Sequence, residues 1–193
     1  ERMMEIISVA VGGALGAGIT ARGVDFASLQ GDKAVVEIMQ RMGADIAQNA
    51  DSVTVNSGAT QATVIDASNC PDIIPVLTVL AAVSEGTTKI INAGRLRIKE
   101  CDRLAAITSE LNKMGAEITE EPEGLTITGK PEGLRGGVEA DAWNDHRIAM
   151  SLAIAAQCCA EPITLTGAGS VSKSYPDFWQ DYKSVGGKFE VLA

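Results

Sequence analysis

The five residues Trp143 to Arg147 (WNDHR) contain the only histidine of a 193-residue chain. A long apolar run, IAMSLAIAAQCCA, follows directly, so either Asn144 or Asp145 can cap a helix. His146 and Arg147 would then lie in its first turn. Two side chains that can carry positive charge oppose the helix dipole there, at about 0.3–1 kcal/mol per charge, unless an anion compensates them. The spacing therefore favours an anion-binding role for His146 and Arg147.

A second cationic segment lies at residues 92–104 (NAGRLRIKECDRL), where four cations, two of them Lys99 and Arg103, face two carboxylates. The segment leads into an amphipathic stretch, and the free N–H groups of a helix start also attract anions. Because the whole chain carries a net charge of −9, an anionic ligand needs such a local excess of positive charge. A simpler interpretation stays open, in which Arg103 forms an exposed pair with Glu100 of small energetic value.

Two further helix starts carry charged residues. Asp72 follows Pro71, a residue suited to a first helical turn, and Lys173 precedes the last amphipathic stretch. Asp72 can equally be a helix cap, and Lys173 a solvated surface lysine. Because helix starts from different repeats can converge on one face, the residues that form the candidate site are Asp72, Lys99, Glu100, Arg103, His146, Arg147 and Lys173.

The composition excludes several classes of protein. No apolar run reaches the roughly 18 residues that a membrane span needs. The negative net charge argues against a nucleic-acid surface. The four cysteines follow no metal-binding spacing and predict reduced thiols in a cytoplasmic protein. The segment GGALGAG lacks the Lys-Ser/Thr of a phosphate loop, so it does not predict one.

Three similar segments, RMGADI, KMGAEI and SVGGKF, place Gly43, Gly115 and Gly186 at intervals of 72 and 71 residues. Apolar residues spaced by three and four precede each glycine and predict an amphipathic helix that ends at a left-handed glycine. A more uniformly apolar helix is expected upstream, at about 3–15, 72–84 and 146–159, with a strand between the two helices and a hairpin after the second. The pattern predicts an α/β (α+β) fold of three repeats, about 1–70, 71–143 and 144–193, with helices inside and sheets outside.

Three motifs, LRIKECDRLAAITSELNKMGAEI, WNDHRIAMSLAIAA and VSKSYPDFWQDYKSVGG, resemble the carboxy-terminal signatures of the 5-enolpyruvylshikimate-3-phosphate synthase family, which glyphosate inhibits. The resemblance covers essentially the whole chain, in order. It implies a two-lobed enzyme in which each lobe is an inside-out α/β barrel of three βαβαββ units, with the substrates between the lobes. Residues 1–193 would then be the carboxy-terminal lobe. The chain starts at Glu1 without an initiator Met, so we expect a part of something longer whose amino-terminal lobe is a partner on the same or a separate chain.

The family transfers the enolpyruvyl group of phosphoenolpyruvate to the 5-hydroxyl of shikimate 3-phosphate, in aromatic amino acid biosynthesis, and releases phosphate. The resemblance implies neither a metal nor an organic cofactor. Matched motif by motif, the resemblance implies that Arg103, Arg147 and Lys173 grip phosphoenolpyruvate, and that His146 supports this pocket. A guanidinium fork suits carboxylate and phosphate oxygens.

The resemblance also implies an acid and a base. Glu100 matches the acid that protonates the methylene carbon, and Asp72 matches the carboxylate that contacts the acceptor hydroxyls and is a candidate base. Lys99 would lie near the 5-hydroxyl. A lone lobe is expected to have little or no turnover.

One position departs from the family pattern: Cys101 stands where the family usually has Ser or Thr. Two other functions stay open. The first is the sibling transferase that uses UDP-N-acetylglucosamine, whose mark would be a reactive cysteine in a mobile loop. The second is a non-catalytic lobe that binds anions or a partner chain.

Overall fold

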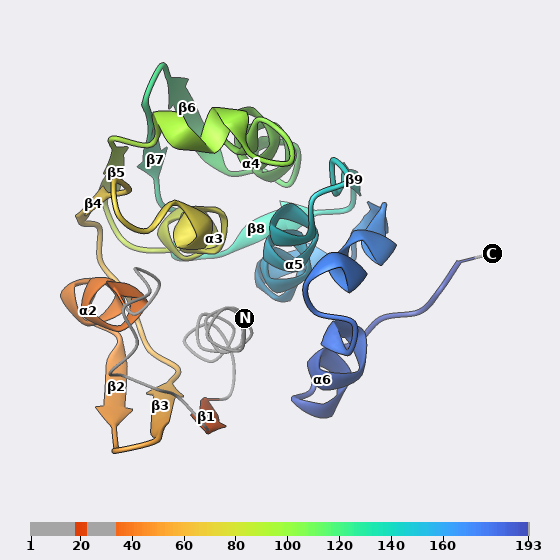
Figure 1. The fold of residues 1–193 in the computed structure, drawn as a ribbon, viewed down its shortest axis with the longest axis horizontal. Helices are drawn as coiled ribbons and strands as arrows, with labels where there is room; N and C mark the ends of the chain where they lie inside the picture. The colour runs from red at the N-terminus through yellow and green to blue at the C-terminus, as the bar shows by residue number, and fades with distance from the viewer. Residues whose placement is uncertain (1–17, 23–33, 193) are drawn as a thin grey trace.

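The computed structural model describes residues 18–22 and 34–192 (Figure 1). Its α-helices are α2 (Ala34–Arg41), α3 (Ile74–Ala82), α4 (Arg103–Lys113), α5 (His146–Ala155) and α6 (Phe178–Ser184). Short 3-10 helices are η2 (Pro71–Ile73), η3 (Gly94–Ile98), η4 (Ala156–Cys158) and η5 (Ala168–Lys173). The strands are β1 (Ile19–Arg22), β2 (Asp45–Gln48), β3 (Ser52–Asn56), β4 (Val64–Asp66), β5 (Thr87–Ile91), β6 (Glu117–Glu121), β7 (Gly124–Thr128), β8 (Leu134–Gly136), β9 (Glu139–Asp141), β10 (Cys159–Glu161) and β11 (Thr164–Thr166).

Two of the sheets repeat one arrangement. The first has strand order β1-β3-β2, and the larger has order β4-β5-β7-β6, so β5, β7 and β6 correspond to β1, β3 and β2. The predicted hairpins β2–β3 and β6–β7 are both antiparallel, as expected. The third repeat differs, because residues 187–192 form no strand after α6. The helix expected at 3–15 lies outside the described residues.

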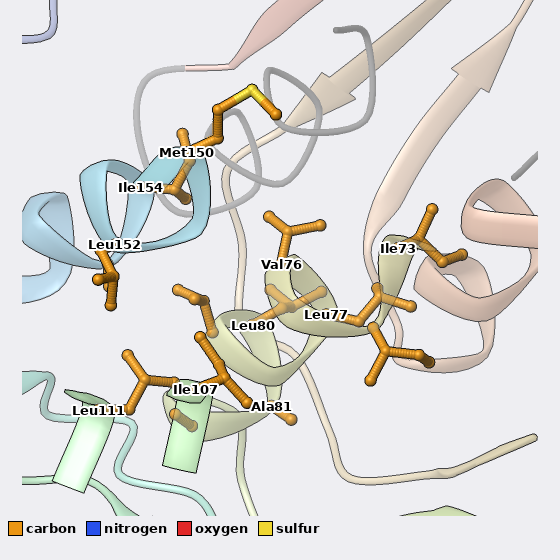
Figure 2. Packing of buried hydrophobic residues seen from close by; sticks show 14 of the residues in the cluster. Ile73, Val76, Leu77, Leu80, Ala81, Ile107, Leu111, Met150, Leu152 and Ile154 are labelled. Carbon is orange, nitrogen blue, oxygen red and sulfur yellow. The ribbon is translucent and has the colours of Figure 1, made fainter. Parts of the chain in front are cut away.

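The apolar helices form the core. Every residue of α3 is buried, and so is every residue of α5 except Arg147, which is partly buried. Figure 2 shows their side chains packed together with those of α4, among them Leu80, Ile107 and Leu152. The outer strand β5 alternates exposed and buried residues, which is the pattern of a sheet with one face to solvent. The predicted fold class is therefore confirmed, with helices inside and sheets outside.

The sheets of the predicted inside-out barrel are not joined into one. The described strands form four separate sheets, and none of these closes on itself, so the sheets lie around the helices without making a closed β-barrel. In the part of the chain that the structure describes, no helix is long and apolar enough to cross a membrane.

Each amphipathic helix ends at its predicted glycine. Gly43, Gly115 and Gly186 have φ values of +83°, +101° and +99°. In each case the glycine N–H and the next N–H donate to carbonyls three and five residues back, as in Gly115 to Asn112 and Ala116 to Leu111, both 3.0 Å. This is the Schellman pattern, which satisfies the free carbonyls of a helix end. The repeat in sequence is thus a repeat in backbone geometry.

Candidate active site

A buried arginine lies at the centre of the candidate site. Arg103 begins α4, and its side chain is only 1% exposed. Its Nε donates to Asp145 Oδ2 at 2.8 Å, its Nη1 to Asp72 Oδ1 at 2.7 Å, and its Nη2 to Glu100 Oε2 at 2.6 Å. These carboxylates come from η2, from the loop before α4 and from the start of α5. The guanidinium therefore joins three helix starts, as the sequence predicted.

The interpretation of Arg103 as an exposed surface pair is wrong, although its contact with Glu100 exists. Burial by itself would lower the pKa of Arg103, but the hydrogen bond and charge of Asp145, together with the charges of Glu100 and Asp72, outweigh burial and raise it. Arg103 therefore stays charged at every pH of interest. Because a buried charge without a partner costs several kcal/mol, the fold requires a carboxylate beside Arg103, and the completely buried Asp145 supplies one.

Asp145 has two roles, of which the sequence indicated one. Of the two N-cap candidates, Asn144 and Asp145, it is Asp145 that caps α5, where its Oδ1 accepts from the Arg147 N–H at 2.8 Å. The same carboxylate also binds Arg103 through both of its oxygens. The side chain is completely buried, and although burial would raise its pKa, Arg103 holds that pKa below its usual range.

Asp72 contacts three cationic side chains. Its carboxylate lies 2.7 Å from Arg103 Nη1, 3.2 Å from Lys99 Nζ and 3.7 Å from Arg147 Nη2. Neither η2 nor α3 has a side-chain cap, so the interpretation of Asp72 as a helix cap is wrong. Burial would raise the pKa of Asp72, but the charges of Arg147, Lys99 and Arg103 together lower it. The carboxylate occupies the middle of a cationic cluster.

His146 is buried in the first turn of α5, and its Nδ1 has no hydrogen-bond partner among the described residues. Burial and the neighbouring charge of Arg147 lower its pKa, so the ring is neutral near pH 7. The positive charge at this helix start is therefore that of Arg147 alone. A neutral imidazole can still donate or accept one hydrogen bond toward a ligand.

Lys173 lies beside this cluster rather than within it. Its Nζ donates to the backbone carbonyl of Asn144 and, at 2.9 Å, to Asn144 Oδ1. It therefore reaches the residue next to Asp145 and forms no described ion pair with Asp72. All seven predicted residues are thus near one another, with six of them around Arg103 and the start of α5.

The backbone before α5 is strained. Trp143 and Asn144 have φ values of +51° and +52°, in the left-handed region. The Asp145 N–H donates to the Ala142 carbonyl at 2.9 Å and closes the turn. Each such conformation costs on the order of 1–3 kcal/mol and is common at functional sites.

Cys101 lies against the same cluster, with its Sγ 3.6 Å from Asp145 Oδ2. Burial, followed by the charge of Asp145, raises the pKa of its thiol to about 12. The pKa of Cys158 is also raised to about 12, and that of Cys159 is raised, in both cases mainly by burial. These three thiols therefore stay protonated and unreactive near neutral pH. No group of three or more His, Cys, Asp or Glu side chains within the described ranges is arranged to hold a metal ion.

Comparisons with known proteins agree on one family. The family model described as EPSP synthase (3-phosphoshikimate 1-carboxyvinyltransferase) matches residues 8–182. The 3-phosphoshikimate 1-carboxyvinyltransferase of Clostridium kluyveri is 54% identical over 178 residues, which are 92% of this chain and 41% of the relative. That of Clostridium beijerinckii is 55% identical over 179 residues, again 92% and 41%. The chain thus spans about two fifths of the length of these relatives.

Solved structures give the same result for the fold. An EPSP synthase from Acinetobacter baumannii superposes with a TM-score of 0.87 at 28% identity, over 98% of this chain and 46% of that one. An enolpyruvyl transferase from Streptomyces tendae shares the fold with a TM-score of 0.78 at 22% identity, over 96% and 43%. With the family model covering most of the sequence and relatives above half identity, the chain belongs to the EPSP synthase family.

Proposed function

We propose that this chain is the carboxy-terminal lobe of a cytoplasmic enzyme that transfers the enolpyruvyl group of phosphoenolpyruvate to the 5-hydroxyl of shikimate 3-phosphate. In this proposal a second, amino-terminal lobe completes the site, no cofactor takes part, and the three repeats form one domain. The observation that carries the proposal is the convergence of three helix starts on Arg103. Such starts offer positive dipole ends and cationic side chains to one anion.

Phosphoenolpyruvate would replace carboxylates of the protein. Asp145 is completely buried and stays on Arg103, whereas the side chains of Asp72 and Glu100 are 31% and 43% exposed. These two can move away from Nη1 and Nη2 and leave a guanidinium edge that fits a carboxylate or phosphate. Arg147, His146 and Lys173 would complete the grip from the start of α5 and the end of η5.

The same two partly exposed carboxylates are suited to proton transfer. Addition of the acceptor oxygen to the enol phosphate needs a proton at the methylene carbon and a base near the attacking hydroxyl. We assign Glu100 as the acid. Asp72 is assigned as the carboxylate that contacts the acceptor hydroxyls and takes the proton of the attacking 5-hydroxyl. Lys99, 3.2 Å from Asp72, would stabilise the charge that develops on the 5-oxygen.

The sibling reaction on UDP-N-acetylglucosamine is not supported by a reactive cysteine, because the thiols of Cys101, Cys158 and Cys159 all have raised pKa values. The relatives with more than half identity carry the name 3-phosphoshikimate 1-carboxyvinyltransferase. Both observations favour shikimate 3-phosphate as the acceptor.

The test uses a chimera in which this chain replaces the region that it matches in the Clostridium kluyveri relative. Phosphate release from phosphoenolpyruvate is measured with shikimate 3-phosphate and, separately, with UDP-N-acetylglucosamine. We expect turnover with shikimate 3-phosphate only, a loss of at least about 100-fold in Glu100→Ala, and no turnover from the 193-residue chain alone. Turnover with the sugar nucleotide, or substantial turnover from the chain alone, would contradict the proposal.

A further inference from the structure

A buried glutamate that the proposed reaction does not use lies near the far end of α4. Glu110 is 1% exposed, and both of its oxygens accept hydrogen bonds from the segment before α5. Its Oε1 accepts from Trp143 Nε1 and its Oε2 from the Asp141 N–H, each at 3.0 Å. Lys113 contacts the same carboxylate from the solvent side, at 2.7 Å. These contacts join α4 to the segment before α5.

The segment that Glu110 holds is the left-handed turn of Trp143 and Asn144. Within this turn Asp141 Oδ1 accepts from the Trp143 N–H at 2.7 Å. Two consecutive non-glycine residues in the left-handed region persist only where neighbouring groups over-determine the backbone. Glu110 supplies two of these bonds, one to the backbone of Asp141 and one to the side chain of Trp143.

Helix α4 holds this turn at two points. Arg103 and Glu110 are seven residues apart, which places them on the same face of the helix, two turns from each other. Arg103 binds Asp145 at one end of the turn, and Glu110 binds Asp141 and Trp143 at the other. The turn and the start of α5 are therefore fixed to α4 along one helix face.

We propose that Glu110 is a positioning residue of the anion site. It touches no candidate ligand group, and it acts through Asp141 and Trp143 to fix the turn that presents Asn144 to Lys173 and Asp145 to Arg103. The link from this turn to catalysis rests on the proposed function, because Arg103 and Lys173 are there assigned to phosphoenolpyruvate. The effect on the turn itself does not depend on that assignment.

Glu110→Gln is the sharpest variant. A glutamine keeps the size of the side chain but has one acceptor oxygen, so either Trp143 Nε1–H or the Asp141 N–H would face an NH₂ group. Trp143→Phe removes only the indole donor and serves as the second variant if Glu110→Gln does not fold. Glu117→Gln, at an exposed position of β6, is the matched control for the change of charge.

The first measurement is amide hydrogen exchange of the 193-residue chain, followed by NMR. We expect exchange at Asp145 and Arg147 to become at least about tenfold faster in Glu110→Gln and Trp143→Phe, since these N–H groups donate within the turn and to the cap. In both variants, exchange in the β5–β7 pair should match that of the unsubstituted chain. In the Glu117→Gln control, exchange at Asp145 and Arg147 should also be unchanged. Unchanged exchange at 145 and 147, or an equal increase everywhere, would overturn the proposal.

The second measurement is the kinetics of the chimera described above. Displacement of the side chains that bind the anion weakens binding in the ground state and the transition state alike. We therefore expect KM for phosphoenolpyruvate to rise about tenfold in Glu110→Gln, while kcat changes less than about threefold. Faster exchange with unchanged KM and kcat would reduce Glu110 to a purely structural residue and overturn its role in the site. An inactive chimera without substitutions would contradict the proposed function, and the exchange result would still decide whether Glu110 fixes the turn.

Discussion

The side chain of Arg103 both stabilises the fold and is a candidate binding group for an anionic ligand. Its side chain is 1% exposed, and its bonds to Asp145 lie on the inner side, away from the more exposed Asp72 and Glu100. Asp145, the inner partner, compensates the buried charge permanently. In the proposed function Asp72 and Glu100, the outer partners, compensate it until an anion binds. The guanidinium is therefore pre-organised, so binding does not have to order it.

Replacement of the inner partner should destabilise the whole chain. Asp145→Asn leaves the shape of the side chain and removes the charge opposite Arg103, so we expect a loss of about 3 kcal/mol in the free energy of unfolding, measured in urea. Asp51→Asn, at an exposed position, is the matched control and should change the free energy by less than about 0.5 kcal/mol. Equal stabilities of the two variants would show that Asp145 does not compensate a buried charge.

Replacement of an outer partner should have the opposite effect on ligand binding. Asp72 lies against Arg103, Lys99 and Arg147, so it competes with an incoming anion for the same cations. We expect Asp72→Asn to bind inorganic phosphate about fivefold more tightly than the unsubstituted chain, measured by calorimetry, because about 1 kcal/mol of ion pairing no longer has to be broken. In the chimera the same variant should turn over more slowly. Weaker phosphate binding in Asp72→Asn would contradict the competition.

At this scale the sequence predicted which residues meet but not all of their bonds. The seven residues that charged helix starts predicted do lie near one another. The second role of Asp145 and the true partners of Asp72 were not predictable, because Arg103 is 42 and 31 residues away from them. Local patterns do not contain such contacts. The role of Glu110 was hidden for the same reason, since a glutamate on an amphipathic helix is ordinarily a solvated residue.

The helices α2, α4 and α6 are each followed by a glycine in the left-handed conformation. Gly43 has φ +83°, and a Cβ built there would meet no atom within 4 Å, so its cost would be purely conformational. Gly58 also has open space, and its φ is not in the left-handed region. These two positions form a matched pair for measuring what the backbone conformation alone requires.

Gly43→Ala should lower the free energy of unfolding by about 1–2 kcal/mol, because an L-residue is strained in the left-handed region. Gly58→Ala should be neutral or stabilising by up to about 1 kcal/mol, since it only reduces the freedom of the unfolded chain. Thermal or urea unfolding of the two variants measures both effects. A similar loss in both would argue against a conformational origin.

Periodicity predicted the long elements well and the short ones poorly. The helices α3, α4, α5 and α6 and the two hairpins lie where apolar spacing placed them. The three-residue strands β8 to β11 were only partly visible, because three residues are too few to show an alternating pattern. Their parallel pairs, β8 with β10 and β9 with β11, depend on tertiary packing.

The molecule as a whole joins its repeats through shared sheets. Strand β4 pairs with β5, and β8 and β9 pair with strands that follow α5, so the last strands of one predicted repeat continue in the sheet of the next. A repeat separated from its neighbours would expose these edges. The sequence indicated three copies, and only the fold showed how they interlock.

Acid should destabilise the folded chain in two stages. The pKa of His146 is lowered from 6.5, mainly by burial, so the unfolded state takes up a proton first and stability declines as pH falls below about 6.5. The pKa values of Glu110 and of Asp72 and Asp145 are lowered from 4.5 and 3.8, respectively, so their contributions are present above these values and are lost at lower pH. Urea unfolding at pH 7.5, 5.5, 4.5 and 3 should give steadily smaller free energies, with a steeper fall below about 4.5. A free energy that is constant down to pH 3 would contradict these shifts.

The bonds of Arg103 also have a consequence for the order in which the molecule folds. They close chain segments of 31 and 42 residues, and the entropy lost in closing a flexible loop of that size is roughly 3 kcal/mol. An exposed ion pair contributes at most about 1 kcal/mol and cannot supply this, whereas the apolar faces of α3, α4 and α5 can supply it by packing. We therefore expect the polar cluster to form after the core has packed and to be lost when the core opens locally. The candidate site would then depend on the packing of core residues that take no part in the proposed reaction.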